Sequence, residues 1–434
     1  MGCLTGSKWM DNSKNNVHIS PDKSDSGKIK PETTAMGSHV TGNRKYTPGR
    51  KVAIVHDWLP LLGGAEKVLE QLLRIYPDAD IFTLFDFLDH DKVPFLRDVR
   101  VTTSALQRFP FVKKYYRHLL PFFPYAIEQF DLSDYDLIIS SSSAVAKGVV
   151  TSPHQLHVCY CHSPMRYAWD LQEQYLRQTG LSSGIRSTLV RIVLHKLRIW
   201  DVISSNRVDS FIANSSYISK RIYKTYRRQS TVIHPPVDIE RFTKQVSKEN
   251  FYLAASRQVP YKRIDLIVEA FREMPDKKLV VIGDGPEHSK IAALAGDNVE
   301  ILGFQSDEVL IDHLGKAKAF IFAAQEDFGI LPVEAQACGT PVIAFGVGGA
   351  CETVIDKITG LHFEEQTVPS IVNAIERFER LQGNFNVATI RKNAEGFSAE
   401  RFQAEIFRHI DRLQRMKKEH DKDSTRHLRD TNAI

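Results

Sequence analysis

The chain has 434 residues, of which 42% are hydrophobic and 25% charged, with only 24 Gly and 19 Pro, and these proportions exclude collagen-like, low-complexity and wholly disordered proteins. Because single hydrophobic cores stop growing at about 250–300 residues, the length predicts two domains of comparable size. Five cysteines are too few for a disulfide framework, and no apolar run reaches the roughly 18–20 residues that span a bilayer, so we expect a cytoplasmic protein.

The net charge of +5 is unevenly distributed. Between Ala105 and Ser230 there are 17 Lys and Arg against 8 Asp and Glu, a local charge of +9 that leaves −4 for the remainder. Such a basic region suits nucleic acid, anionic lipid or a phosphorylated substrate, and charge alone does not choose among them. The sequence has no signature of nucleic-acid reading, and we expect no nucleic-acid partner.

Residues 1–49 have no core pattern. They contain few large aliphatic side chains and many Ser, Asn, Lys and Gly residues, and such a composition cannot bury enough apolar surface to order a chain. We predict a disordered leader.

From Lys51 the pattern changes to short β-rich runs that alternate with helical stretches. Buried strands are predicted at KVAIVHD, DADIFTLF, YDLIISSSS and QLHVCYCHS, followed by a strand and a helix at DSFIANSSYISKRIYKTY. Continuous apolar strands are typical of parallel sheets that are covered on both faces. We assign residues 50–240 to a first Rossmann-like domain, which ends where two prolines in STVIHPPVDIERF interrupt regular structure.

A second alternating series fills residues 241–395. Strands are predicted at FYLAASR, KKLVVIGDG, VEILGF, AKAFIFAA and TPVIAFGVGG, with helices at Arg263–Met274, Glu287–Leu294, Ser306–His313, Leu331–Cys338 and Ala350–Val354. The fold class is therefore α/β, with two doubly wound domains that face a central cleft, and in such sheets ligands bind beyond the carboxyl ends of the strands. Helical spacing then predicts a closing helix over 396–416, followed by a charged tail at 417–434.

The most specific motif, EDFGILPVE, runs from Glu326 to Glu334 and crosses from a strand into a helix. Both carboxylates can point into a cleft there, and Glu334 near the helix start can accept hydrogen bonds from hydroxyl groups. The backbone N–H groups of Phe328, Gly329 and Ile330 would form a positively charged nest. The alternative is a capped helix with a solvated Glu326.

Two cations flank a second strand-to-helix step. Arg257 leaves a predicted strand end, and Lys262 follows five residues later, just before a helix. A guanidinium fork and an ammonium point charge suit a pyrophosphate and could neutralise the charge that builds on a departing nucleotide. A surface salt-bridge pair is the alternative, and because Arg263 is adjacent to Lys262, the sequence leaves open which of the two points inward.

Three glycine loops follow strand ends, at Gly63-Gly64, Gly283–Gly285 and Gly346–Gly349. The first allows the backbone to approach a phosphate at a helix N-terminus. Because this loop does not read G-x-G-x-x-G, a nicotinamide dinucleotide is disfavoured. Each loop alone is a weak signal, since glycine turns are common in α/β folds.

His162 follows a strand at a loop mouth, where it could bond a substrate hydroxyl, although a lone histidine is also often structural. Cys159, Cys161 and His162 do not predict zinc, because an extended run turns the cysteines to one face and the histidine to the other. We therefore predict no metal site.

Two segments combine basic residues with aromatic or aliphatic ones: ALQRFPFVKKYYRHLLPFFPY, from Ala105, and IRSTLVRIVLHKLRIW, from Ile185. Segments of this composition are found at membrane interfaces. Core helices with solvated basic faces look similar, so the sequence leaves both interpretations open.

Taken together, the motifs resemble one family. The chain is similar to GT-B retaining glycosyltransferases of family 4 (group 1), particularly bacterial O-antigen and exopolysaccharide mannosyltransferases, in the motifs GGAEK, HSPMRYAWD, FIANSSYISKRI, VIHPPVD, SRQVPYKRIDL, VVIGDGPE and EDFGILPVEAQACGTPVIAFGVGGACETV. The resemblance extends from about Lys51 to Met416. It implies that the nucleotide-sugar lies mainly on the second domain and that the closing helix crosses back to the first.

The resemblance also implies residue roles, with Arg257, Lys262, Glu326 and His162 as the catalytic set. The implied donor contacts are Arg257, Lys262, Gly63 and Gly64 to the diphosphate, Glu334 to the ribose, Glu326, His162 and the Phe328–Ile330 backbone to the sugar, and Gly283 and Phe304 to the base.

The implied reaction moves mannose from GDP-mannose to a lipid-linked or growing polysaccharide acceptor at the cytoplasmic face of the membrane. In this family the reaction is thought to occur on the front face of the sugar, where stabilisation of the leaving group would dominate. There is no D-x-D cluster in a suitable loop, so we expect catalysis without a divalent metal and no cofactor. No residue distinguishes guanine from uracil, and a UDP-sugar-dependent transferase, a sugar-nucleotide epimerase and a non-catalytic nucleotide-sugar sensor remain alternatives.

Overall fold

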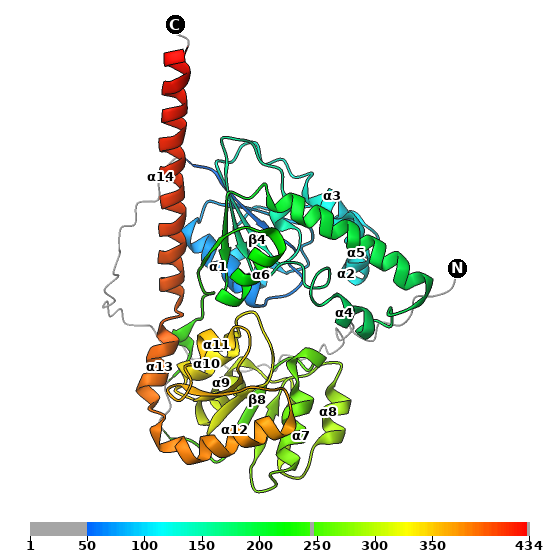
Figure 1. The fold of residues 1–434 in the computed structure, drawn as a ribbon, viewed down its shortest axis with the longest axis vertical. Coiled ribbons are helices and arrows are strands. Elements are labelled where there is room, and N and C mark those ends of the chain that lie inside the picture. Colours follow the sequence, from blue (N-terminus) through cyan, green and yellow to red (C-terminus); the bar gives the residue numbers. More distant parts are fainter. Residues whose placement is uncertain (1–49, 244–246, 432–434) are drawn as a thin grey trace, which may run out of the picture. The chain divides into compact units, whose positions relative to one another are not determined.

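The computed structural model describes residues 50–243 and 247–431, so the leader that we predicted at 1–49 lies outside the described residues. Two parallel β-sheets organise the described chain (Figure 1). We call residues 50–240 the first half and residues 241–395 the second half. The predicted fold class, two doubly wound Rossmann-like α/β units, is confirmed by the strand orders of the two sheets.

The first sheet has seven strands in the order β3-β2-β1-β4-β5-β6-β7. Their bounds are β1 Val52–His56, β2 Asp80–Thr83, β3 Val101–Thr103, β4 Leu137–Ser142, β5 Leu156–Cys161, β6 Ser210–Ala213 and β7 Ser230–Val232. The second sheet has six strands in the order β10-β9-β8-β11-β12-β13. Their bounds are β8 Tyr252–Ala255, β9 Leu279–Ile282, β10 Val299–Gly303, β11 Ala319–Phe322, β12 Val342–Phe345 and β13 Gly360–Phe363.

Helices cover both sheets. Their bounds are α1 Gly64–Ile75, α2 Val112–Tyr115, α3 Phe123–Ile127, α4 Gln172–Gln178, α5 Gly184–Ser205, α6 Ser216–Tyr226, α7 Ile264–Arg272, α8 His288–Leu294, α9 Asp307–Lys316, α10 Ile330–Ala337, α11 Ala350–Thr353, α12 Val368–Leu381, α13 Val387–Glu395 and α14 Ala399–Thr431. Among the described residues, no helix combines the length and the apolar character needed to cross a membrane.

Local sequence explains how the central strands lead into their helices. Every residue of β1, VAIVH, is buried, as expected for a central parallel strand that is covered on both faces. The loop that follows turns into α1 at Gly63, where the side chain of Glu66 accepts a hydrogen bond from the Gly63 N–H at 2.9 Å. This contact satisfies one of the free donors at the start of the helix and fixes where α1 begins.

The chain passes between the two sheets twice. The first passage follows β7, and the second joins α13 to α14. The two passages are hydrogen-bonded to each other, because the Val237 N–H donates to the Phe397 carbonyl at 2.9 Å. From there α14 runs beside α1, where Gln403 donates to the side-chain oxygen of Gln71 at 2.7 Å (Figure 1).

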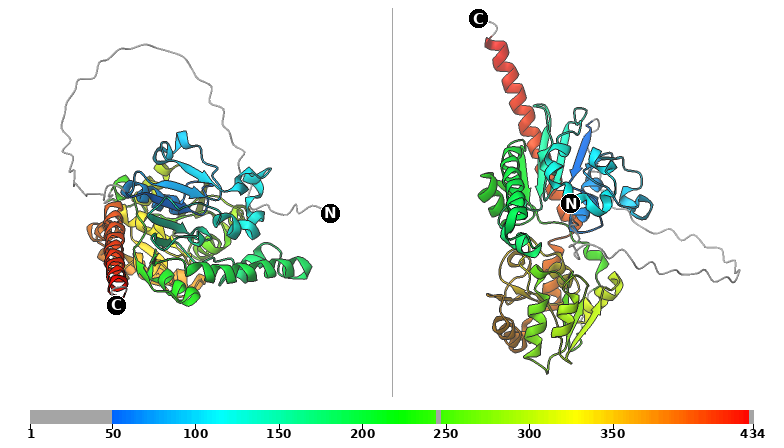
Figure 2. Two further views of the ribbon diagram at one scale, coloured as in Figure 1. Left: turned by 90° about the horizontal axis from the view of Figure 1, so that it is seen from above. Right: turned by 90° about the vertical axis from the view of Figure 1, so that its right-hand side faces the viewer.

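Helix α14 is longer than the helix that we predicted. It continues to Thr431, whereas the sequence pattern placed its end at Met416 and a charged tail beyond it. Just past the expected end, the Lys417 ammonium donates to the carbonyls of Pro153 and Gln155 at 2.6 and 2.9 Å. Figure 2 shows the last part of α14 extending beyond the body of the molecule.

Candidate active site

The predicted site residues of the second half gather where its strand order reverses, between β8 and β11. Arg257 lies two residues after β8, and Glu326 lies four residues after β11. In a doubly wound sheet this position leaves a crevice at the carboxyl ends of the strands, which is where such folds bind ligands. Arg257 and Glu326 therefore lie on the two loops that leave these neighbouring strands.

Lys262 and Glu326 form an ion pair in this crevice. Lys262 ends a short 3₁₀ turn before α7, and its side chain is 15% exposed, against 18% for Glu326. Burial, and then the charge of Arg166, lower the pKa of Lys262 to about 8. The structure thus joins two residues to which we had assigned separate contacts, and it shows that Lys262 rather than Arg263 pairs with the acidic motif.

Arg257 is exposed beside this pair, and among the described residues its guanidinium has no ion-pair partner. Its loop packs tightly against the glycine turn at Gly283, which has a φ of +122° and where an added Cβ would lie 2.0 Å from the Ser256 carbonyl oxygen. Phe304 stands after β10 with 82% of its surface exposed. The loops that hold Arg257 and Gly283 are therefore in contact, and Phe304 is accessible to a ligand.

The loop from Glu326 to Ile330 rests directly on the glycines that follow β12. The Gly349 N–H donates to the Glu326 carbonyl at 2.8 Å, and an added Cβ on Gly349 would lie 2.2 Å from the Cα of Phe328. Gly329, with a φ of +86°, turns the chain into α10. These glycines are thus required for the path of the acidic loop.

Glu334, in the second turn of α10, is buried and receives a hydrogen bond of 3.0 Å from the ammonium of Lys67 in α1. The Gly63–Gly64 turn approaches the same place, because an added Cβ on Gly64 would lie 3.0 Å from the terminal methyl carbon of Ile330. The two predicted motifs therefore meet. The sequence analysis missed Lys67, although it lies only three residues after Gly64 in the motif GGAEK.

His162 ends a chain of hydrogen-bonded groups in the first half. Its Nε2 lies 2.8 Å from the Ser141 hydroxyl, which lies 3.1 Å from Nδ1 of His56, and Nε2 of His56 lies 3.6 Å from the Glu66 carboxylate. Burial, and then the charge of His56, lower the pKa of His162 to about 4. His162 is therefore neutral near pH 7 and can exchange hydrogen bonds without carrying charge. The sequence analysis missed His56 and Glu66.

The two halves also share an ionic cluster that the sequence analysis did not anticipate. The carboxylate of Asp327, next to Glu326, pairs with Arg166 and with Arg221, the latter at 3.4 Å. Both arginines belong to the first half of the chain.

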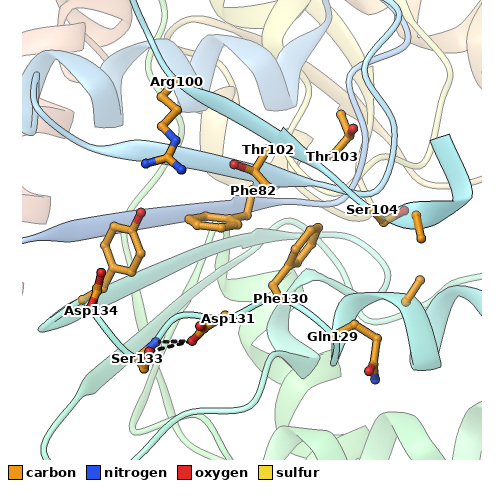
Figure 3. Close-up of a pocket in the computed structure, with 13 residues that line it drawn as sticks. Phe82, Arg100, Thr102, Thr103, Ser104, Gln129, Phe130, Asp131, Ser133 and Asp134 are labelled. Carbon is orange, nitrogen blue, oxygen red and sulfur yellow. Dashed lines mark hydrogen bonds between the residues drawn. The ribbon is translucent and has the colours of Figure 1, made fainter. Parts of the chain in front are cut away.

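A separate cavity of about 520 Å³ lies at the edge of the first sheet, between β2–β3 and the segment that precedes β4 (Figure 3). Phe82 and Phe130 line it, with Arg100 and Asp131 nearby, and Asp131 is hydrogen-bonded to Ser133. It shares no lining residue with the crevice described above. Within the described part of the chain, no group of three or more His, Cys, Asp or Glu side chains is arranged to hold a metal ion.

Two family models match adjoining parts of the chain. Residues 62–241 match the model described as Glycosyltransferase Family 4, and residues 237–396 match the model described as glycosyl transferases group 1. Together they extend from the loop before α1 to the end of α13, across both sheets.

Curated relatives match over parts of their length. A GDP-mannose-dependent monoacylated alpha-(1-6)-phosphatidylinositol monomannoside mannosyltransferase of Corynebacterium glutamicum is 30% identical over 236 residues, which are 45% of this chain and 60% of that protein. The chain spans about half the length of the curated relatives it matches.

Solved structures match over nearly their full length. HepE of Anabaena, in complex with UDP-glucose, has a TM-score of 0.60 at 20% identity, covering 83% of this chain and 99% of that one. The sucrose-phosphate synthase of Thermosynechococcus elongatus has a TM-score of 0.65 at 18% identity, covering 85% of this chain and 100% of that one. At these identities the similarity establishes the fold.

Proposed function

Because this chain belongs to the family 4, group 1 glycosyltransferases, we propose that it transfers a sugar from a nucleotide-sugar to an acceptor with retention of configuration. The observation that carries this proposal is the Lys262–Glu326 ion pair at the point where the second sheet reverses its strand order, with Arg257 on the loop after β8 and Glu334 on α10, which follows β11. We propose further that residues 241–395 bind the donor, that residues 50–240 bind the acceptor, and that the helix beginning near residue 396 straps the two together.

The charges in the crevice support a distribution of roles. Lys262 and Arg257 would bind the diphosphate, Glu334 the ribose hydroxyls, and Glu326 with the Phe328–Ile330 backbone the sugar. Glu326 is paired with Lys262 and Glu334 with Lys67, so that both carboxylates have a cationic partner. A donor would bring its own anionic diphosphate, to which Lys262 can turn while its former partner accepts sugar hydroxyls.

The proposed mechanism is electrostatic. Cations fixed around the diphosphate stabilise the charge that develops as the glycosidic oxygen departs, and they are already oriented before the reaction begins. A diphosphate oxygen accepts the proton of the attacking hydroxyl on the same face of the sugar. His162, neutral because its pKa is about 4, bonds a sugar hydroxyl without competing for that proton. The residues that we propose for these steps do not include a metal ligand.

A thermal-shift panel tests the donor. We propose GDP-mannose, with a UDP-sugar as the alternative, because the Corynebacterium relative is GDP-mannose-dependent and the Anabaena structure contains UDP-glucose. At 100 times its dissociation constant the correct donor adds about 2.7 kcal/mol to stability. We expect this shift with GDP-mannose, and equally in EDTA and in magnesium. Stabilisation by UDP-sugars alone would show that the donor is a UDP-sugar rather than GDP-mannose. If no nucleotide raised the thermal stability, the result would contradict the proposed function.

The acceptor that we propose is a lipid-linked glycan at the membrane surface, and α5 supports this. Ser187, Leu194 and Leu197 bury one face of this 22-residue helix. On the opposite side exposed apolar residues recur at helical spacing, with Lys196 among them between Ile192 and Ile199, and Arg186 at their edge. The exposed apolar residues are Ile185, Leu189, Ile192, Ile199 and Ile203. The helix lies at the periphery in both views of Figure 2. An exposed helix face that combines apolar residues with cations suits an anionic lipid surface.

Vesicle sedimentation tests this surface. Replacing both Ile192 and Ile199 by Glu is expected to lower binding to phosphatidylglycerol vesicles at least about tenfold, because each buried isoleucine contributes about 1.5–3 kcal/mol. The matched control is Ile358→Glu, which changes an isoleucine of the second half that is 47% exposed. Equal binding by the double variant and the control would refute the lipid surface.

A further inference from the structure

Asp327 is held by the other half of the chain. Its carboxylate is 12% exposed and lies between the guanidinium groups of Arg166, which follows β5, and Arg221, on α6. Arg221 is fixed in turn by the Ser163 hydroxyl at 2.8 Å and the Asp170 carboxylate at 2.5 Å. We propose that Asp327 is a positioning residue: by pairing with Arg166 and Arg221 it holds the loop at residues 326–330, which we propose to bind the donor, against the first half. We call this pairing the clasp.

Helix α6 receives further contacts from the second half. The carboxylate of Glu352 accepts hydrogen bonds from the backbone N–H groups of Ser216 and Tyr217, at 2.8 and 3.1 Å, where α6 begins. Gln325 donates to the Tyr217 hydroxyl at 3.1 Å. Carboxylates are stabilising at helix N-termini, so Glu352 caps a helix of the other half. Two carboxylates of the second half, Asp327 and Glu352, thus bind helix α6 of the first half. We call this contact between the halves the seam.

The position of Asp327 in the sequence gives the clasp its effect on the site. Glu326 precedes it, and the backbone of residues 328–330 follows it, so that both groups proposed to bind the sugar are one peptide away. Without this carboxylate the two arginines would face each other as partly buried like charges, and the seam would open. The conformation of the loop at residues 326–330 and the contact between the two halves therefore both depend on the side chain of Asp327.

The test compares Asp327→Asn with the matched control Asp170→Asn. Both variants remove a carboxylate from Arg221, but only the first removes a contact between the halves. Hydrogen exchange is measured over α6 and the loop at 326–330, and turnover is measured with the nucleotide-sugar that stabilises the protein in the thermal-shift panel. We expect Asp327→Asn to raise exchange at both segments and to lower kcat about tenfold to a hundredfold, by analogy with other displacements of positioning groups. The affinity for the nucleoside diphosphate alone should change less than threefold.

A double variant tests whether Asp327 and Arg166 affect kcat through their pairing or independently of each other. If Asp327 acts by pairing with Arg166, then Asp327→Asn with Arg166→Gln should lose no more kcat than the worse single variant. Additive losses, unchanged exchange in Asp327→Asn, or an equal effect of Asp170→Asn would each overturn the clasp. The kinetic arm rests on the proposed function, whereas the exchange arm does not. Raised exchange in a protein that binds no nucleotide would keep the clasp and reject the function.

Discussion

Replacing Lys262 by alanine is expected to lower kcat by about two to three orders of magnitude, as does the loss of one preorganised donor at an oxyanion. Lys262 is the least exposed cation of the proposed diphosphate site, and its present partner, Glu326, is itself assigned to the sugar. Its removal withdraws charge from the leaving group and leaves Glu326 without a counter-ion. Release of nucleoside diphosphate under saturating donor and acceptor measures the loss. Near wild-type turnover would contradict the assignment.

Two companion variants make this result specific. Lys290→Ala removes an exposed lysine of α8 that pairs with Asp265 and Glu287, and it should leave turnover unchanged. Lys262→Arg tests the charge through pH. Because the pKa of Lys262 is lowered to about 8, the lysine is charged below that pH and loses its proton above it. In the wild type kcat/KM should therefore fall above about pH 8, and arginine should move this fall to higher pH.

The second large effect is expected on stability, from Asp201→Ala. Asp201 is fully buried in α5 and pairs with the ammonium of Lys147, whose side chain is 2% exposed. Trp169 and Tyr226 donate to its other oxygen at 2.8 and 2.9 Å. Removing the carboxylate leaves a buried ammonium without a counter-ion, which costs about 3–5 kcal/mol. Urea unfolding should show this as an earlier midpoint.

The control for Asp201→Ala removes an ion pair that is exposed at the surface. Glu173→Gln breaks the two contacts between Glu173 and Arg191 at the surface, and we expect no measurable change in the midpoint. A further variant that replaces Lys147 by Met and Asp201 by Leu should lose less stability than Asp201→Ala, because neither charge remains buried. A double variant as unstable as the sum of its single changes would show that the pair is not coupled.

Much of the fold follows from local patterns. β1 and β4 are wholly buried runs, and their strong apolar pattern made the first Rossmann-like series visible in the sequence. β3 and β7 escaped prediction because each has three residues and none of them is buried, so their hydrophobic pattern is too short to read. The end of α14 escaped for another reason, since Lys417 is held by carbonyls of a distant segment rather than by an apolar stripe.

The candidate site likewise contains residues whose positions follow from local sequence and residues whose positions do not. The positions of Arg257 and Glu326 after strands, and of Glu334 in the helix that follows, could be predicted because they are local properties of the sequence. Their partners could not, because Lys67 and Glu334 are 267 residues apart and meet only through the packing of the two halves. The same holds for Arg166 beside Asp327. A cation in a helix or loop has no local pattern that identifies which distant carboxylate it will reach.

The paired passages between the sheets limit how the two halves can move relative to each other. The two covalent connections are joined to each other by the hydrogen bond from Val237 to Phe397, so they meet at one junction. Arg401 fixes the junction to the first passage by donating to the His234 carbonyl at 2.9 Å. Sliding or separation of the halves would have to break these bonds. We therefore expect relative motion of the two halves to be a rotation about this junction rather than a separation.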